Sequence, residues 1–375
     1  MVDPITAVKN SCARIAALSS SRVKINDEAC EKFALDLVSR LGDLRASCCG
    51  GDESKKEDTT FHDYEDEWTS LNNNINTTGR RENPVTIEEE VSAMATLHLL
   101  NFGHGHKQLL RELKLGKYKF GGYGSAYVTM MEGVGRATLK GTMSSQRMVD
   151  WTPIETKEFF FLPSDCLLAS QITDVLRETG SALLSKGYNS LGGFIIQILS
   201  SSTSNNTVSS FVRHVIDLIP AFRDEGTYQL PDGEIMTVHF YKKAFLLAND
   251  IPFRFGLRGN MFNLKGLESL TVMADNVLPA VLRAKGVLEL DDAASEEIAG
   301  GVLPMGDVLE IELRALSIEA SEHIVSRVNQ NLTKNGKNES FLTCAELDLW
   351  LWGILGKEEG LRDAPRHFTP TTVYY

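Results

Sequence analysis

The sequence has no excess of basic residues. It carries 38 Lys and Arg against 50 Asp and Glu, a formal net charge of −12 over 375 residues. Proteins that bind a nucleic-acid backbone normally show a basic footprint, so this balance argues against a nucleic-acid partner. A small anionic ligand is still compatible with it, because such a ligand needs only a local cluster of cations. A ligand that carries an amine is compatible as well.

Paired cysteines and long apolar runs are also missing. The six cysteines contain no C-x-x-C pair, and no basic region followed by an apolar run opens the sequence. No stretch is long enough and apolar enough to span a membrane. We therefore expect reduced thiols in a cytoplasmic protein with no membrane partner. The cysteines are Cys12, Cys30, Cys48, Cys49, Cys166 and Cys344.

Familiar catalytic motifs are absent too. There is no G-x-S-x-G, and the glycines of 121–124 and 133–135 are too loosely spaced for a dinucleotide or phosphate fingerprint. His104 and His106 form an H-x-H near His98, but no third or fourth ligand follows in register. The pattern favours ordinary histidines in a glycine-rich loop, and we predict neither a metal nor a cofactor.

Helical periodicity dominates what is present. Residues from about 7 to 46 have apolar side chains at helical spacing, and a long amphipathic helix is expected from Val308 to about Leu332. A β-hairpin is predicted around the turn 231–233, with alternation from 235 to 241. The pattern becomes helical again at Lys242. The fold class is therefore mainly α with a small β-hairpin element.

Residues 49–84 differ in composition from the rest of the chain. They are rich in Gly, Asp, Glu and Asn, which is typical of a surface insertion. No internal repeat is visible. We expect one domain over 1–375 with an insertion at 49–84.

A single acidic residue, Asp275, interrupts the apolar run 270–279. A lone carboxylate there loses hydration, so it needs a partner, a raised pKa or a role beside developing positive charge. Helix capping is the plain alternative. It fits poorly, because Pro279 suits the first helical position and would place the cap at Leu278. The residues alone leave structure and function evenly balanced.

Four other charged residues are notable. Glu322 falls on the apolar stripe of the long helix, where a satisfied structural ion pair is the favoured interpretation. Glu310 and Arg314 are spaced i, i+4, which usually indicates a solvated surface pair. Lys242 lies where strand gives way to helix, a position that commonly presents a side chain to a cleft.

A series of short segments, in order, resembles the queuosine salvage family, the queuosine 5'-phosphate N-glycosylases. Glu178-Thr179-Gly180 with its following leucines is similar to E-T-G-x-x-L-L, and 220–224 to P-x-[FY]-R-D. Tyr241-Lys242-Lys243-Ala244 resembles Y-K-[KR]-A. The segment 273–279 matches M-x-A-D-x-x-L-P, 306–314 matches G-D with E-[VI]-E-[IL]-R, and 347–352 matches L-D-x-x-L-W. Tyr374 and Tyr375 match a final Tyr-Tyr. The similarity covers most of 176–375 and is thinner before it.

The resemblance implies a fold like that of helical DNA glycosylases in a single domain. It also implies hydrolysis of the N-glycosidic bond of queuosine 5'-phosphate, which releases queuine for salvage into transfer RNA. Asp275 would then stabilise or trap an oxocarbenium-like sugar, or orient the attacking water. Lys242 could donate to the departing base, bind the phosphate or keep Asp275 ionised.

The same resemblance implies a set of substrate-binding residues, with Asp250, Asp307 and Glu310 as acceptors for the secondary ammonium and diol of queuine. The set is Asn101, Phe102, Tyr123, Tyr241, Asp250, Met273, Ala274, Asp307, Glu310 and Arg314. The partner is the small-molecule substrate, and we expect a monomer.

The sequence departs from the family pattern at three positions. His98 stands where an aspartate is frequent, Gly124 where a tryptophan is frequent, and Asn276-Val277 where Tyr-Arg is frequent. These departures bear on base and phosphate contacts. They also sustain one alternative, a binding protein for queuine or its nucleotide that has lost catalysis. The other alternative is a glycosylase for another nucleoside or for a base in nucleic acid, and the acidic charge argues against a polynucleotide substrate.

Overall fold

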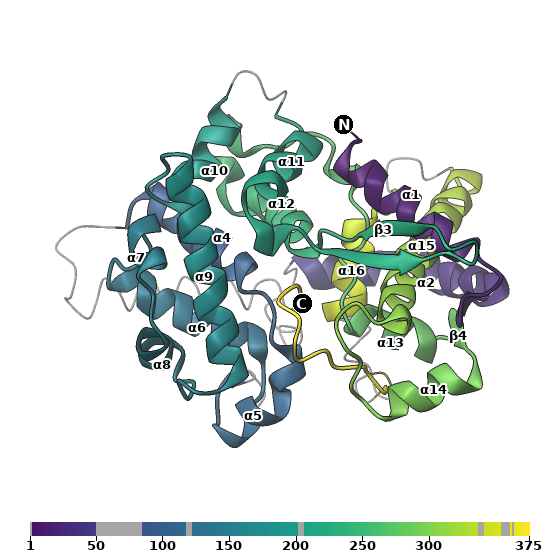
Figure 1. Ribbon diagram of the computed structural model, residues 1–375. Coiled ribbons are helices and arrows are strands. Elements are labelled where there is room, and N and C mark those ends of the chain that lie inside the picture. The colour runs from purple at the N-terminus through teal and green to yellow at the C-terminus, as the bar shows by residue number, and fades with distance from the viewer. Residues whose placement is uncertain are drawn as a thin grey trace. The chain divides into compact units, whose positions relative to one another are not determined.

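The computed structural model describes residues 2–49, 85–117, 122–201, 206–336, 341–353, 361 and 364–375 (Figure 1). The described chain is mainly helical with two small antiparallel sheets, which confirms the predicted class. None of its helices is long and apolar enough to cross a membrane. Most of the predicted insertion, 50–84, lies outside the described residues.

The chain divides into two compact units. Unit 1 combines Met1–Asn72, Glu225–Phe240 and Glu268–Phe368, and unit 2 combines Asn73–Asp224, Tyr241–Leu267 and Thr369–Tyr375. Each unit is therefore built from segments that are distant in sequence. That the units together form one catalytic domain stays a prediction.

Unit 1 is organised around its longest helix, α15 (Val308–Lys334), which confirms the prediction for that segment (Figure 1). Four helices of the unit pack against it. They are α1 (Pro4–Ala16), α2 (Asp27–Cys49), α13 (Val277–Ala284) and α16 (Cys344–Gly353). A shorter helix, α14 (Asp292–Ala299), packs on strand β4. The helical segment predicted near the start of the chain is two helices, because a strand separates α1 from α2.

Both sheets belong to unit 1. Strands β2 (Glu225–Gln229) and β3 (Ile235–His239) form the predicted hairpin, with Thr227 opposite Thr237. Strands β1 (Val23–Ile25) and β4 (Leu288–Leu290) form the second sheet, which the sequence analysis did not predict.

Unit 2 is built from helices linked by short turns. In it α4 packs on α6, α10 and α12, α7 packs on α9, and α11 packs on α12. The helices are α4 (Ile87–Leu99), α5 (Lys107–Glu112), α6 (Ala126–Leu139), α7 (Ser145–Val149), α8 (Pro153–Phe160), α9 (Leu167–Ser185), α10 (Leu191–Ser200), α11 (Val208–Leu218) and α12 (Lys242–Phe255). The 3₁₀ turns η2 (His104–His106), η3 (Pro220–Phe222), η4 (Gly256–Arg258) and η5 (Asn260–Phe262) lie between them, and η6 (Leu267–Ser269) follows at the boundary of the units.

One close helix contact in unit 2 depends on a glycine. The Gly192 N–H donates to Ser92 Oγ at 2.7 Å, which ties α10 to α4. A Cβ at position 192 would lie 2.2 Å from the Glu88 carbonyl oxygen. The two helices can therefore approach this closely only because residue 192 has no side chain.

Candidate functional site

Asp275 is buried and lies directly before α13. Its Oδ1 accepts the Val277 N–H at 2.7 Å and the Leu278 N–H at 3.4 Å. The helix begins at Val277, so Pro279 is its third residue and not its first. The sequence argument against a capping role was therefore wrong. Proline is tolerated throughout the first turn, since those N–H groups have no intrahelical partner. The carboxylate instead satisfies two of the amides that begin α13.

Arg314 holds the backbone on the other side of this carboxylate. Its Nε donates to the Ala274 carbonyl oxygen at 3.1 Å, and its Nη1 lies 3.3 Å from Glu310 Oε1. The guanidinium carbon lies 3.9 Å from the centroid of the Phe240 ring. The two charged side chains are only 3% and 5% exposed. The predicted solvated surface pair is wrong.

The packing of α15 explains this error. Every residue from Leu309 to Ile318 is buried, so this part of the helix has no solvated face. Helical spacing predicts which side chains meet, but not whether solvent reaches them. A buried arginine needs a charged or hydrogen-bonding partner, which Glu310 and the Ala274 carbonyl supply.

Two residues absent from the predicted set fix the same segment. The Met273 N–H donates to Asp348 Oδ1 at 2.7 Å, and Asn276 Nδ2 donates to the His367 carbonyl oxygen at 3.0 Å. Asp348 belongs to the L-D-x-x-L-W match, a signal that was available in the sequence. His367 gave none. We call Asp275, Glu310, Arg314, Asp348 and His367 the Asp275 cluster.

His367 is neutral at physiological pH. Burial, with a smaller contribution from Arg314, lowers its pKa to about 3, while Asp275 opposes the shift. A buried imidazole avoids the cationic form because the protein interior solvates a charge poorly. The Asp275 cluster therefore holds an uncharged histidine close to its carboxylate.

Unit 2 contains a buried lysine, Lys243, that contacts segments distant in sequence. Lys243 Nζ donates to the carbonyl oxygens of Leu99 at 2.7 Å and Val373 at 2.6 Å. The rings of Phe102, Phe222 and Tyr374 lie 5.4, 5.9 and 5.8 Å from it. We call these four side chains, Lys243 with its three rings, the Lys243 cluster.

The proton of Lys243 is easily lost. Burial lowers its pKa to about 7; Asp224 opposes this shift and Lys242 contributes to it. A neutral amine still has two N–H donors, which matches the two carbonyl acceptors. The cluster can therefore persist whether or not the lysine is charged.

Lys242 and Tyr241 lie at the start of α12. Lys242 is the first residue of this helix, which confirms the predicted change from strand to helix. Tyr241 adopts a left-handed conformation with φ 52°, and its N–H donates to the Asp224 carbonyl oxygen at 3.2 Å. Both side chains are buried. A non-glycine residue in this region is uncommon and is retained where surrounding packing fixes it.

Asn101 and Asp250 lie near the end of α4 and on α12. Asn101 is half-buried and directly follows the helix, while Asp250 Oδ2 pairs with His98 Nε2 at 3.0 Å. His106 Nε2 contacts Gln171 Oε1 and the Pro370 carbonyl oxygen, each at 3.1 Å. His98 and His106 thus make ordinary structural contacts. Within the described ranges no group of three or more His, Cys, Asp or Glu is arranged to hold a metal ion.

Tyr123 and Asp307 are the remaining predicted residues. Tyr123 is half-buried between two glycines with positive φ. At Gly124, with φ +110°, a Cβ would lie 2.7 Å from Arg111 Cγ, so a tryptophan could not replace this glycine without a local rearrangement. Asp307 caps α15, its Oδ1 accepting the Leu309 N–H at 2.8 Å.

The predicted residues fall into two groups. Unit 1 contains Met273, Ala274, Asp275, Asp307, Glu310 and Arg314, whereas unit 2 contains Asn101, Phe102, Tyr123, Tyr241, Lys242 and Asp250. Direct contacts join Ala274, Glu310 and Arg314 in unit 1, and Phe102 belongs to the Lys243 cluster of unit 2.

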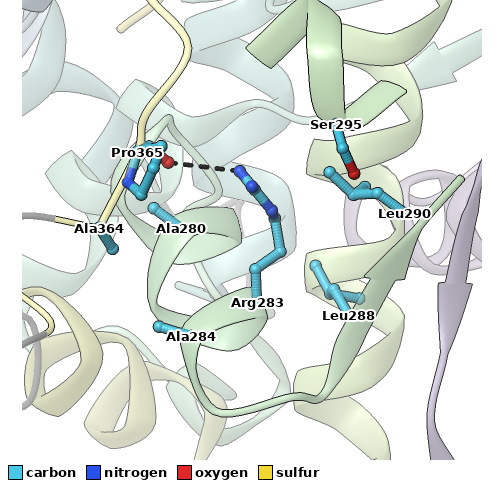
Figure 2. A pocket seen from close by; sticks show the side chains of 8 residues that line it. All are labelled: Ala280, Arg283, Ala284, Leu288, Leu290, Ser295, Ala364 and Pro365. Carbon is cyan, nitrogen blue, oxygen red and sulfur yellow. Dashed lines mark hydrogen bonds between the residues drawn. The ribbon is translucent and has the colours of Figure 1, made fainter. Parts of the chain in front are cut away.

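A pocket of about 240 Å³ opens in unit 1 beside the end of α13. Figure 2 shows Arg283 crossing it, with Nη1 donating to the Pro365 carbonyl oxygen at 3.3 Å. Burial lowers the pKa of Arg283. None of the predicted site residues is among the eight that line this pocket, which are Ala280, Arg283, Ala284, Leu288, Leu290, Ser295, Ala364 and Pro365.

Comparison with known proteins places this geometry in context. A family model described as queuosine salvage protein matches residues 83–375. The chain is similar to proteins named queuosine 5'-phosphate N-glycosylase/hydrolase from Nematostella vectensis, 29% identical over 208 residues, and Mus musculus, 28% identical over 203 residues. These matches cover 53% and 54% of this chain and 56% of each relative. The chain thus spans little more than half the length of the curated relatives it matches.

Proposed function

Because the chain belongs to the queuosine salvage protein family, we propose that it hydrolyses the N-glycosidic bond of queuosine 5'-phosphate. Cleavage of the bond between the sugar C1' and the base, with addition of water at C1', yields queuine and ribose 5-phosphate. The names of the similar proteins from Nematostella vectensis and Mus musculus support this reaction. The observation that carries the proposal is the buried Asp275 carboxylate, which accepts the Val277 N–H, while the Ala274 carbonyl just before it accepts Arg314 Nε.

Asp275 suits the stabilisation of a sugar cation. An N-glycosidic bond breaks through an oxocarbenium-like state, so a fixed carboxylate beside C1' lowers the energy of that state or forms a bond to it. The N-terminus of α13 and the two amides on Oδ1 favour the ionised form. The carboxylate is thus preorganised and need not reorient as charge develops.

The departing base needs separate assistance. A 7-deazaguanine has carbon where purines have N7, so the usual protonation site is missing and donors must act at the carbonyl or ring edge. Three alternative roles are proposed for Lys242: it is that donor, it binds the phosphate, or it keeps Asp275 ionised. These three roles predict different pH profiles for Lys242→Met.

The substrate contacts follow from the sequence candidates. The proposed substrate contacts are Asn101, Phe102, Tyr123 and Tyr241 in unit 2 and Met273 and Ala274 in unit 1, with Asp250, Asp307 and Glu310 as acceptors for the ammonium and diol. Asp250 already contacts His98, so a substrate ammonium would compete with that contact. Asp307 would have to combine binding with the capping of α15.

The location, oligomeric state, form of the substrate, domain organisation and fold belong to the same proposal. We propose that the chain acts as a cytoplasmic monomer on a free nucleotide and not on a polynucleotide, consistent with its net charge of −12. We also propose one catalytic domain with a fold like that of helical DNA glycosylases, supported by the mainly helical structure.

Mass-spectrometric detection of free base tests the function. The protein is incubated separately with queuosine 5'-phosphate, queuosine and guanosine 5'-monophosphate. We expect many turnovers per protein molecule with queuosine 5'-phosphate and far fewer with guanosine 5'-monophosphate. Turnover of guanosine 5'-monophosphate alone would assign a glycosylase of another nucleotide. Saturable, stoichiometric capture of queuine without turnover would assign a binding protein.

A further inference from the structure

Arg314 contacts the protein through its Nε, its Nη1 and the face of its guanidinium. Nε faces the Ala274 carbonyl oxygen at 3.1 Å, Nη1 faces Glu310 at 3.3 Å, and the guanidinium stacks on the Phe240 ring. Its side chain is 3% exposed. An arginine that binds a substrate phosphate must present its N–H fork to the ligand. This one is turned toward the backbone beside Asp275.

The contact with Ala274 has a specific geometric consequence. The carbonyl that accepts from Nε belongs to the peptide group whose nitrogen is that of Asp275, so the bond fixes the plane of this peptide. On the other side the Val277 N–H fixes the position of Oδ1 at 2.7 Å. Asp275 is therefore held on both sides: Arg314 holds the peptide before it, and the start of α13 holds its Oδ1.

We propose that Arg314 is a positioning residue that sets the Asp275 carboxylate through the Ala274 carbonyl, and that it is not a ligand of the substrate. This inference rests on the proposed function, in which Asp275 faces the sugar. It replaces the substrate-binding role that the sequence predicted for Arg314. Glu310 acts with it, by keeping the guanidinium in register along α15.

The requirement is for an arginine and not merely for a cation. The planar guanidinium stacks on Phe240 while directing separate N–H groups at Ala274 and Glu310. A lysine would keep the charge, but it has no planar fork and one terminal nitrogen. Arg314→Lys therefore separates the charge of this side chain from its geometry.

Steady-state kinetics with queuosine 5'-phosphate test the proposal. We expect Arg314→Lys to lower kcat by about 10²-fold, the cost of a small misplacement of a catalytic group, and to leave KM within about threefold. Arg327→Lys is the matched control, since Arg327 lies on the same helix and pairs at the surface with Asp27. It should match the wild type. A kcat near that of the wild type with a raised KM would overturn the proposal and restore a binding role.

Substrate affinity in the Asp275→Asn background gives a second readout. Isothermal titration should give the same Kd for Asp275→Asn and for Asp275→Asn/Arg314→Lys, whereas a substrate ligand would lose affinity in the double variant. If Arg314→Lys fails to fold, Phe240→Leu takes its place, because it removes the ring on which the guanidinium stacks. We expect that variant to lose kcat without losing affinity. Absence of turnover by the wild-type protein would instead reject the proposed function.

The position of Asp275 can also be observed without turnover. In a crystal structure of Arg314→Lys we expect the Ala274–Asp275 peptide and the Asp275 carboxylate to be displaced from the positions described above. An unchanged peptide and carboxylate would overturn the positioning role, whatever the kinetics of the wild-type protein.

Discussion

The two clusters both bury a cation, but they compensate it differently. In unit 1 Arg314 has a buried carboxylate partner, Glu310, in addition to a carbonyl and a ring. In unit 2 the two hydrogen bonds of Lys243 go to carbonyl oxygens and its other close contacts are aromatic rings. A guanidinium stays ionised in proteins, and Glu310 supplies the opposite charge that its burial requires. Burial lowers the pKa of the lysine to about 7, although the charge of Asp224 opposes the shift.

The difference suggests distinct tasks. A permanently charged arginine can hold the Asp275 backbone in one geometry at any pH at which the protein is folded. A lysine with a labile proton joins two segments distant in sequence, at Leu99 and Val373, and keeps both hydrogen bonds when it becomes neutral. The first arrangement suits the orientation of a reacting group. The second suits the attachment of the segment Thr369–Tyr375 to the rest of unit 2.

The largest expected effect on stability comes from breaking the paired arrangement. Arg314→Met leaves Glu310 buried without its partner, and we expect the free energy of unfolding to fall by about 3–5 kcal/mol. Urea denaturation measures it. Arg314→Met/Glu310→Gln should recover part of the loss. Arg40→Met removes an exposed pair of the same spacing, Asp36–Arg40, and should cost below about 0.5 kcal/mol. Similar losses at both sites would contradict the account.

The unpaired arrangement predicts a pH dependence. Between about pH 7 and pH 10.4 the unfolded chain keeps the Lys243 proton while the folded protein releases it, so stability rises with pH by up to about 1.4 kcal/mol per unit. Lys243→Met should remove that contribution. Denaturation midpoints of wild type and variant from pH 6.5 to pH 9.5 measure it. Lys186→Met, at an exposed position in the same unit, is the control.

Parallel pH profiles for wild type and Lys243→Met would show that Lys243 holds its proton as an ordinary lysine does. The proposed difference between the two clusters would then be wrong, because both cations would stay charged throughout this pH range.

His367 extends the comparison to a group that avoids its charge altogether. Its pKa is lowered to about 3, while an unfolded histidine titrates near 6.5. As the pH falls from about 6.5 toward 3, the unfolded chain therefore binds a proton at His367 that the folded protein does not bind. The free energy of unfolding then falls by up to about 1.4 kcal/mol per pH unit. His367→Asn should flatten this acid limb, whereas His323→Asn, at a partly exposed position on α15, should not.

A small effect is expected at a partly exposed ion pair. Lys9 Nζ lies 3.0 Å from Glu322 Oε1, with side chains 38% and 29% exposed. This confirms the structural ion pair favoured from the sequence. Because solvent screens it, Glu322→Gln should change the free energy of unfolding by less than about 1 kcal/mol. A loss near that of Arg314→Met would mean that solvent exposure does not determine how much each ion pair contributes to stability.

Local patterns predicted the regular elements well. The extent of α15 followed from its periodicity, the hairpin from its turn, and the start of α12 at Lys242 from the change of period. The pairing of β1 with β4 could not be predicted, because it joins Val23 to Leu290 across most of the chain.

The candidate site was predicted less completely. Asp275 was identified as a lone acid in an apolar run, but its bonds to α13 were missed because the helix begins two residues before Pro279. Burial of Glu310 and Arg314 depends on the packing around α15, which helical spacing does not specify. His367 accepts the Asn276 side chain through its backbone carbonyl. Every residue type has this carbonyl, so the sequence gives no signal for the contact.

The most direct test of the central claim is the turnover of queuosine 5'-phosphate by Asp275→Asn beside the wild-type protein. Asparagine keeps an acceptor oxygen for the Val277 N–H but removes the charge, so the start of α13 should persist. We predict that queuine release falls on the order of 10³-fold or more while circular dichroism and substrate affinity are retained. Undiminished release by a folded Asp275→Asn protein would contradict the claim that this carboxylate carries the reaction.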